Sequence, residues 1–237
     1  MIISHSHKFI LLKSIKTAGT SIEAALSTLC SGDDIVTPLN NYAFNKDASS
    51  TIEHRAMNAE KLDWWDREEI GQHVDAATLR NHVPETVWND YLKISIARNP
   101  WDRLVSLFTW RNKNNPALKP RKRFYHYLGV PFDEFGHLKK QFLEYARSDW
   151  ETNDRFYILD GELCADYVIR YENLNESFGE LCERLEVPRI ELPRLKTGIR
   201  PAQYHYSKYY DDETVDLVAR RHANDLRLFG YEFERVG

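Results

Sequence analysis

The feature that most constrains the fold of this chain is a short apolar run that leads, through a glycine-containing turn, into an amphipathic segment. Residues 9–12 (Phe-Ile-Leu-Leu) form a continuous apolar stretch of the kind that a buried parallel strand shows. The turn over residues 14–20 contains Gly19, and a helix is expected to open at Thr20. Its apolar residues recur at helical spacing: Ile22, Ala25, Leu26 and Leu29. The segment therefore predicts a strand, a loop and a helix in that order.

Two further strands are predicted, each followed by a helix. Residues 91–97 precede Pro100 and a helix over 101–110, and residues 167–171 precede a helix over 173–186. Other helices are predicted over residues 55–65, 76–91 (with a break near Pro84), 132–147 and 211–229. Strands that alternate with helices predict an α/β fold with a central, mostly parallel sheet flanked by helices.

The last predicted helix carries signals at both of its ends. Asp211 or Asp212 can cap its start, and Gly230 can end it.

Composition excludes several classes of protein. The formal net charge of -4 argues against a nucleic-acid binder. The apolar run at residues 9–12 is too short for a signal peptide or a membrane span, so a soluble, cytoplasmic protein without a transmembrane segment is expected. The 3 cysteines lack a C-x-x-C pair, which predicts reduced thiols rather than a disulfide framework or a zinc site.

The loop over residues 13–21 (Lys-Ser-Ile-Lys-Thr-Ala-Gly-Thr-Ser) has the chemistry of a phosphate site. The first N–H groups of a helix lack internal partners, and the helix dipole favours an anion there. Gly19 allows close approach of a ligand, Thr20 and Ser21 offer hydroxyls, and Lys16 supplies a positive charge. A Walker A loop is excluded, because its G-x-x-x-x-G-K-S/T pattern is absent.

A structural interpretation of the same residues is compatible with the phosphate site. Thr20 and Glu23 have the spacing of a capping box at the start of an ordinary helix.

A second candidate phosphate segment covers residues 96–107 (Ile-Ala-Arg-Asn-Pro-Trp-Asp-Arg-Leu-Val-Ser-Leu). Arg98 is predicted at the carboxyl end of a strand, where ligands collect in open α/β sheets. Its guanidinium matches a phosphate as a two-pronged donor. Pro100 suits the first turn of a helix, and Ser106 lies about two turns further on.

The two segments together resemble the PAPS-dependent sulfotransferases of the carbohydrate type, where PAPS is 3′-phosphoadenosine-5′-phosphosulfate. Their first loop reads P-K-T-A-G-T-S, with Ile15 here in place of the proline, and their second segment reads R-N-P-x-D-R-x-x-S. The stretch over residues 166–174 and the C-terminal residues 225–231 also look like the family. The resemblance implies one sulfotransferase domain over residues 1–237 with a P-loop-NTPase-like fold.

The resemblance also implies site residues. The nucleotide-binding residues would be Lys16, Thr17, Ala18, Gly19, Thr20, Ser21, Arg98 and Ser106. In the family, the residues matching Arg98 and Ser106 bind the 3′-phosphate. Lys16 would stabilise charge on the bridging oxygen as 3′-phosphoadenosine 5′-phosphate (PAP) leaves, and no metal is expected.

The acceptor hydroxyl also needs a base. His54 is the first candidate, because its place between the two phosphate segments resembles that of a histidine in K-H-A-type segments of related sulfotransferases. Glu23 is the second candidate and Glu53 the third.

A glycan is the expected acceptor by resemblance, and lipid, metabolite and tyrosine acceptors stay open. The basic run at 119–123 can guide an anionic acceptor, although such runs are more often solvated loops. Aromatic side chains such as Trp64, Trp65 and Tyr125 can stack on sugars or fill the core. Residues 196–198 are candidates for closing over the nucleotide.

Two other functions remain as alternatives, and the sequence leaves the oligomeric state open. One alternative is a P-loop-type kinase of a small metabolite, and the other is a non-catalytic nucleotide-binding protein.

Overall fold

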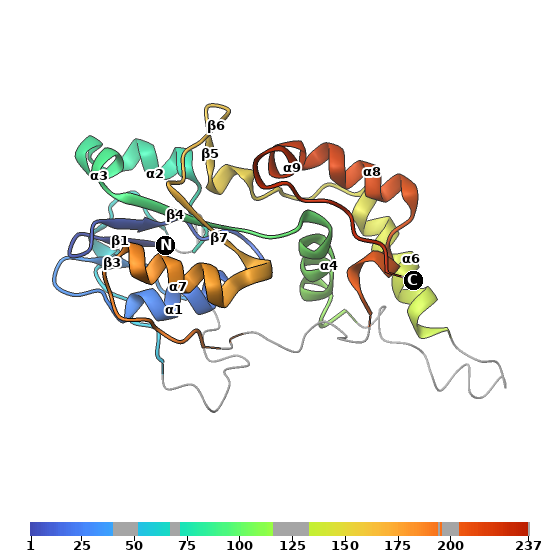
Figure 1. Ribbon diagram of the computed structural model, residues 1–237, viewed down its shortest axis with the longest axis horizontal. Helices are drawn as coiled ribbons and strands as arrows, with labels where there is room; N and C mark the ends of the chain where they lie inside the picture. Colours follow the sequence, from blue (N-terminus) through green and yellow to red (C-terminus); the bar gives the residue numbers. More distant parts are fainter. Residues whose placement is uncertain (40–51, 67–71, 116–132, 194, 196–203, 237) are drawn as a thin grey trace. The chain divides into compact units, whose positions relative to one another are not determined.

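The computed structural model describes residues 1–39, 52–66, 72–115, 133–193, 195 and 204–236, and every statement on structure below concerns these residues (Figure 1). The chain forms two compact units. The first contains residues 1–98 and 153–197, and the second contains residues 99–152 and 198–237. The single domain expected over residues 1–237 stays a prediction.

The first unit is built on a five-stranded sheet with the order β3-β1-β2-β4-β7. Its strands are β1 (Ile2–Ser4), β2 (Phe9–Leu11), β3 (Ile35–Val36), β4 (Leu92–Ala97) and β7 (Tyr167–Arg170). Strands β2, β4 and β7 run parallel to one another. Strand β1 is antiparallel to both of its neighbours, β2 and β3.

The three strands predicted from the sequence are thus confirmed, but the predicted sheet was too simple. The sheet is mixed rather than mostly parallel, because β1 and β3 add antiparallel pairs at one side. These two strands have three and two residues, which is too short to give a recognisable pattern. The carboxylate of Asp34 stabilises the β1–β2 turn by accepting hydrogen bonds from the backbone N–H groups of His5 and Ser6.

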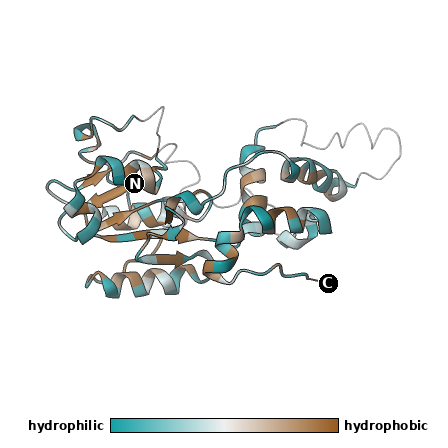
Figure 2. Ribbon diagram, turned by 90° about the horizontal axis from the view of Figure 1, so that it is seen from above, coloured by the Kyte–Doolittle hydropathy of each residue, from teal (hydrophilic) through white to brown (hydrophobic). Residues whose placement is uncertain are grey.

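Helices cover both faces of this sheet (Figure 1). They are α1 (Gly19–Ser27) and α7 (Leu174–Arg184) on one face, and α2 (Ala76–His82) and α3 (Glu85–Asp90) on the other. Alternate residues of β2 point to opposite faces. Phe9 and Leu11 join the core under α1 and α7, while Ile10 joins the core under α2 and α3. Figure 2 shows the strands as the most hydrophobic part of the unit.

Short elements complete the first unit. They are the 3-10 turns η1 (Ala59–Lys61), η3 (Asp154–Phe156) and η4 (Tyr171–Asn173), and the hairpin of β5 (Ile158–Leu159) and β6 (Glu162–Leu163). The helix predicted over residues 55–65 is wrong, since the only helical turn found there is η1. The segment instead pairs with the sheet through a bridge between Met57 and Val36. The predictions over 76–91, broken at Pro84, and over 173–186 are confirmed.

The second unit is helical in its described residues. It contains α4 (Pro100–Arg111), α6 (Glu134–Arg147), η5 (Tyr206–Tyr209), α8 (Asp212–Arg221) and α9 (Ala223–Phe229). Aromatic side chains form its interior. The ring of Phe142, for example, lies 5.5 Å from that of Phe108 and 4.8 Å from that of Tyr210.

The helix ends follow the sequence signals in most places. Asp211 and Thr214 form a capping box at α8, and Gly230 ends α9 in the left-handed conformation. The single helix predicted over 211–229 is wrong, because it breaks at His222. The ring of His222 lies 2.6 Å from the buried carboxylate of Asp225 at this break.

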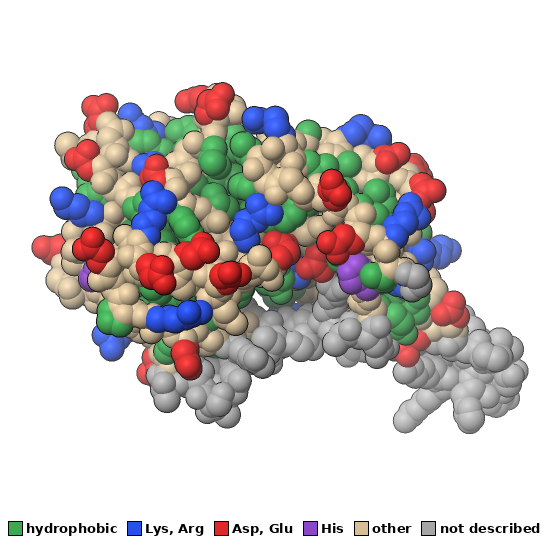
Figure 3. All heavy atoms as spheres, in the orientation of Figure 1, with side chains coloured by type: hydrophobic (Ala, Val, Ile, Leu, Met, Phe, Trp, Pro, Cys, Tyr) green, Lys and Arg blue, Asp and Glu red, His purple; other side chains and the backbone are tan. Residues whose placement is uncertain are grey.

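Acidic and basic side chains are interspersed over the face seen in Figure 3.

Candidate functional site

Three parallel strands of the first unit end side by side, and the candidate site lies beyond their carboxyl ends. The last paired residues of β2 and β4 are Leu11 and Ile94, and those of β4 and β7 are Ala97 and Arg170. The Ser14 hydroxyl donates to the carbonyl oxygen of Ile96 at 2.6 Å, which ties the loop after β2 to β4. The predicted loop, Arg98 and the first residue after β7 therefore share one edge of the sheet.

The loop itself is held in a bent conformation. The side chain of Asn153, which is 2% exposed, clamps Ile15. It accepts from the Ile15 N–H at 3.1 Å and donates to the Ile15 carbonyl at 2.9 Å. Lys16 and Ala18 are left-handed, with φ of 64° and 63°. Such conformations are rare for residues other than glycine, and they occur in backbone nests that bind anions.

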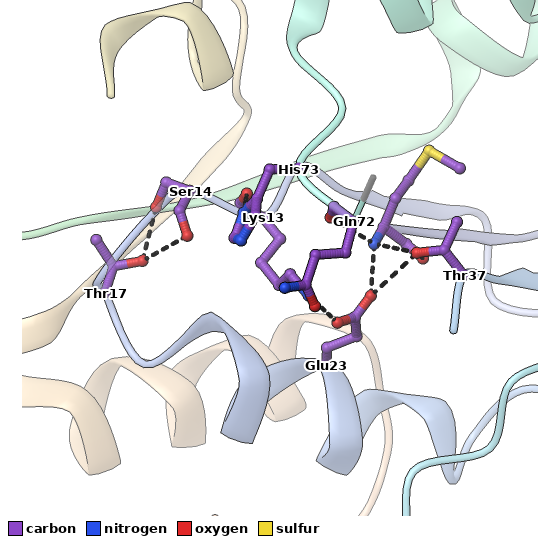
Figure 4. A network of polar contacts seen from close by, with 8 residues as sticks. Lys13, Ser14, Thr17, Glu23, Thr37, Gln72 and His73 are labelled. Carbon is purple, nitrogen blue, oxygen red and sulfur yellow. Dashed lines mark hydrogen bonds and ion pairs between the residues drawn. The ribbon is translucent and has the colours of Figure 1, made fainter. Parts of the chain in front are cut away.

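Helix α1 begins at Gly19, and its N-cap residue Ala18 offers no capping side chain. The predicted capping box of Thr20 and Glu23 does not form, because the Glu23 carboxylate is engaged elsewhere (Figure 4). The first turn of α1 thus presents backbone N–H groups that no side chain of the described residues caps, as an anion site requires. Gly19 is needed here because a Cβ atom would overlap the Lys13 side chain.

Glu23 belongs to a buried ion network rather than to an open site (Figure 4). Its carboxylate, 0% exposed, accepts from the Lys13 Nζ and from the Met1 backbone nitrogen. The Lys13 Nζ also donates to Gln72 Oε1 at 2.9 Å. Burial alone would raise the pKa of Glu23, but the positive charges of Lys13 and of the Met1 amine lower it to about 2.

These contacts argue against Glu23, the second candidate base. The Glu23 side chain is 0% exposed and its carboxylate already accepts from Lys13 and Met1, so an acceptor hydroxyl has no surface of Glu23 to reach.

His54, the first candidate base, is half-buried near this network. The N–H of the next residue, Arg55, donates to the Ser27 hydroxyl at 3.1 Å and so joins the segment to the end of α1. Burial lowers the pKa of His54 to about 4; the charge of Glu23 opposes this shift, and that of Lys13 adds to it. His54 is therefore neutral near pH 7.

His73 is a second histidine at the loop, and the sequence analysis missed it. Its Nδ1 lies 2.8 Å from the Lys13 carbonyl oxygen. Because a carbonyl can only accept, Nδ1 carries the hydrogen and the lone pair is on Nε2. Burial and the charge of Lys13 lower the pKa of His73 to about 3. No motif marks residues 72–73, which reach the loop only through the fold.

Arg98 lies where the sequence predicted it, directly after β4. Its Nη1 donates to the Lys16 carbonyl oxygen at 2.7 Å. Its guanidinium carbon lies 3.8 Å from the centre of the Tyr171 ring. The structure therefore brings the second phosphate segment into direct contact with the first.

The structure leaves several of the predicted site residues untested. Ser106 lies in α4 of the second unit, so its sharing of a phosphate with Arg98 stays a prediction. Residues 196–198, the basic run 119–123 and Tyr125 lie outside the described residues. Trp64 is half-buried and stacks on His82, with the ring centres 4.8 Å apart.

Three general findings concern the described residues alone. The three cysteines are free thiols. Within the described ranges, no helix is both long and apolar enough to cross a membrane. The same ranges contain no group of three or more His, Cys, Asp or Glu residues that could hold a metal ion, and the expectation of a metal-free reaction stays a prediction.

The buried pair makes a prediction about stability. Glu23→Gln should lower the free energy of unfolding by about 3–5 kcal/mol at pH 7, because Lys13 would keep a buried charge without its counter-charge. Urea unfolding measures this. The exposed pair of Asp33 and Lys61 gives the control, since Asp33→Asn should change little. A loss below about 1 kcal/mol for Glu23→Gln would contradict the account.

The pH dependence of the free energy of unfolding gives a second test of the Glu23→Gln variant. A carboxylate whose pKa falls from 4.5 to about 2 on folding stabilises the protein above pH 4.5, and this contribution is lost as the pH falls towards 2. The wild-type protein should therefore lose more stability than Glu23→Gln over this range.

Comparison with known proteins agrees with the chemistry of the loop. The model of a family described as the sulfotransferase family matches residues 1–232, which is nearly the whole chain. No curated protein and no solved structure matches the chain. By this match, the chain belongs to the sulfotransferase family.

Proposed function

We propose that this protein transfers the sulfuryl group of PAPS to an acceptor hydroxyl, and that the acceptor is a glycan. One observation supports PAPS as the sulfuryl donor. Arg98, the residue expected at the 3′-phosphate, donates a hydrogen bond to the carbonyl of Lys16, the residue expected at the bridging oxygen. This bond ties the two predicted phosphate segments together at one edge of the sheet, which suits a nucleotide with phosphates at both its 3′ and 5′ positions.

The first turn of α1 suits the 5′ end of such a donor. Its backbone N–H groups and the hydroxyls of Thr20 and Ser21 would bind the 5′-phosphate, and the helix dipole adds to the attraction. The strand, loop and helix around Lys16 support a P-loop-type fold in which the lysine precedes the glycine.

The two lysines at the loop, Lys13 and Lys16, have different roles. Lys13 is paired with Glu23 and buried, so its charge serves the structure. Lys16 would supply the charge that stabilises the reaction. As the bond between sulfur and the bridging oxygen breaks, negative charge grows on that oxygen, and a nearby ammonium group lowers the barrier.

The acceptor hydroxyl loses its proton as its oxygen bonds to sulfur. A neutral imidazole is needed to take this proton, and both His54 and His73 are neutral near pH 7. His73 becomes the first candidate, because its bond to the Lys13 carbonyl leaves the lone pair on Nε2. His54 becomes the second. The negative charge of a bound nucleotide would raise the pKa of either histidine and favour proton uptake.

The family match gives no support to a metabolite kinase or to a non-catalytic binding protein. The glycan acceptor, the metal-free reaction, the cytoplasmic location and the lack of nucleic-acid binding remain parts of the proposal.

Calorimetric titration of the metal-free protein tests the donor. PAP and PAPS should bind at least about tenfold more tightly than adenosine 5′-phosphosulfate or ATP, because both competitors lack the 3′-phosphate that Arg98 would bind. A preference for ATP with magnesium would favour a kinase instead. Failure to bind any of the four nucleotides would contradict the proposed function.

A pair of histidine variants tests the base. His73→Ala should lower turnover about 100-fold or more while the affinity for PAP stays within about twofold, because general-base catalysis contributes on this scale. Transfer from labelled PAPS to a panel of glycans measures turnover, and His54→Ala serves as the matched comparison. Near-full turnover of His73→Ala rejects this base, and a loss confined to His54→Ala restores the assignment made from the sequence.

A further inference from the structure

The parallel pairing of β4 and β7 brings Arg98 and Tyr171 together. Ala97 and Arg170 are register partners, and each is the last residue of its strand. Arg98 and Tyr171 are the residues that follow directly, so the sheet itself places them side by side. The guanidinium carbon lies over the face of the Tyr171 ring, 3.8 Å from its centre, which is a close cation–π contact.

Two contacts with described residues orient the Arg98 guanidinium. A guanidinium is planar, and its N–H donors lie in its plane. The close approach to the Tyr171 ring face limits the tilt of that plane. The bond from Nη1 to the Lys16 carbonyl, at 2.7 Å, sets the rotation within the plane. Arg98 is 8% exposed, so it has little freedom to turn in any other way.

This orientation matters for binding a phosphate. An arginine binds a phosphate best through two parallel N–H donors in the plane of its guanidinium. When that plane is tilted away from the phosphate, only one of the two hydrogen bonds can form. The ring of Tyr171 is half-buried at the same edge of the sheet as the loop.

We propose that Tyr171 is a positioning residue that determines the preference of this protein for nucleotides with a 3′-phosphate. It acts through Arg98, whose guanidinium it holds in the plane that engages the phosphate. The inference rests on the proposed function, since it assumes that Arg98 binds the 3′-phosphate. It adds a residue that the motif over 96–107 does not contain.

The ring face, not the hydroxyl, carries this role. Phenylalanine keeps the face on which the guanidinium stacks. Leucine fills similar space but offers no flat surface, so the guanidinium can tilt. Tyr171→Phe is therefore the matched control for Tyr171→Leu.

Calorimetric titration with PAP and with adenosine 5′-monophosphate, which lacks the 3′-phosphate, tests the inference. The readout is the ratio of the two dissociation constants. The wild-type protein and Tyr171→Phe should share a ratio within about twofold, and both should prefer PAP about tenfold or more. Tyr171→Leu should lower the ratio at least about fivefold by weakening PAP alone, with the affinity for the monophosphate unchanged.

A double variant separates positioning from a general loss of structure. Arg98→Lys keeps the charge but loses the plane, so it should lower the ratio as much as Tyr171→Leu does. Combining the two changes should lower the ratio no further, because Tyr171 acts only through Arg98. If Tyr171→Leu does not fold by circular dichroism, Tyr171→Met takes its place.

The outcomes distinguish the inference from the function on which it rests. A wild-type protein that binds both nucleotides equally overturns both. A wild-type preference for PAP that survives in Tyr171→Leu overturns the role of Tyr171 alone. If the two changes lower the ratio additively in the double variant, the role of Tyr171 is overturned as well, because Tyr171 then acts independently of Arg98.

Discussion

The buried ion pair between Lys13 and Glu23 closes the base of the loop on which the site depends. Lys13 lies two residues after the end of β2, and Glu23 lies in α1, so the pair joins the two elements that flank the loop. Both side chains are fully buried, and burial of either charge alone would be strongly unfavourable. The loop between them must therefore bend within a short span. Left-handed conformations at Lys16 and Ala18, and the lack of a side chain at Gly19, make this bend possible.

The same pair also shapes the electrostatics of the site. Because the Lys13 charge is compensated within the core, the loop can contain a second lysine, Lys16, which is the proposed catalytic cation. The Lys13 side chain contacts Gln72, and its backbone carbonyl contacts His73. One residue thus joins the strand, the helix and the segment that contains the proposed base. At the neighbouring strand ends, Arg98 links β4 to the loop, and Tyr171 links β7 to Arg98.

Much of this arrangement could be predicted from local patterns in the sequence. The strands β2, β4 and β7 have apolar runs, Pro100 marks the start of α4, and Arg98 lies at the expected strand end. What the sequence could not predict depends on contacts between distant residues. Glu23 has the spacing of a capping residue, but the buried charge of Lys13 competes more strongly for its carboxylate.

Other errors have similar physical causes. The apolar residues over 55–65 suggested a helix, yet Leu62 and Trp64 pack against the core under α2 and α3 without forming one. His73 has no surrounding motif, and only the folding of residues 72–73 onto the loop brings it to Lys13. The helical pattern over 211–229 is continuous and gives no sign of the break at His222, where the ring contacts the buried Asp225.

A crystal structure of the protein with PAP is the most direct test of the central claim, which is that the ends of β2 and β4 hold a nucleotide with two phosphates. The account predicts the 5′-phosphate at the first turn of α1, within hydrogen-bond distance of the N–H groups of Gly19 and Thr20. It predicts the 3′-phosphate at the guanidinium of Arg98. A nucleotide bound away from these two groups, or one whose 3′-phosphate does not contact Arg98, would contradict the account.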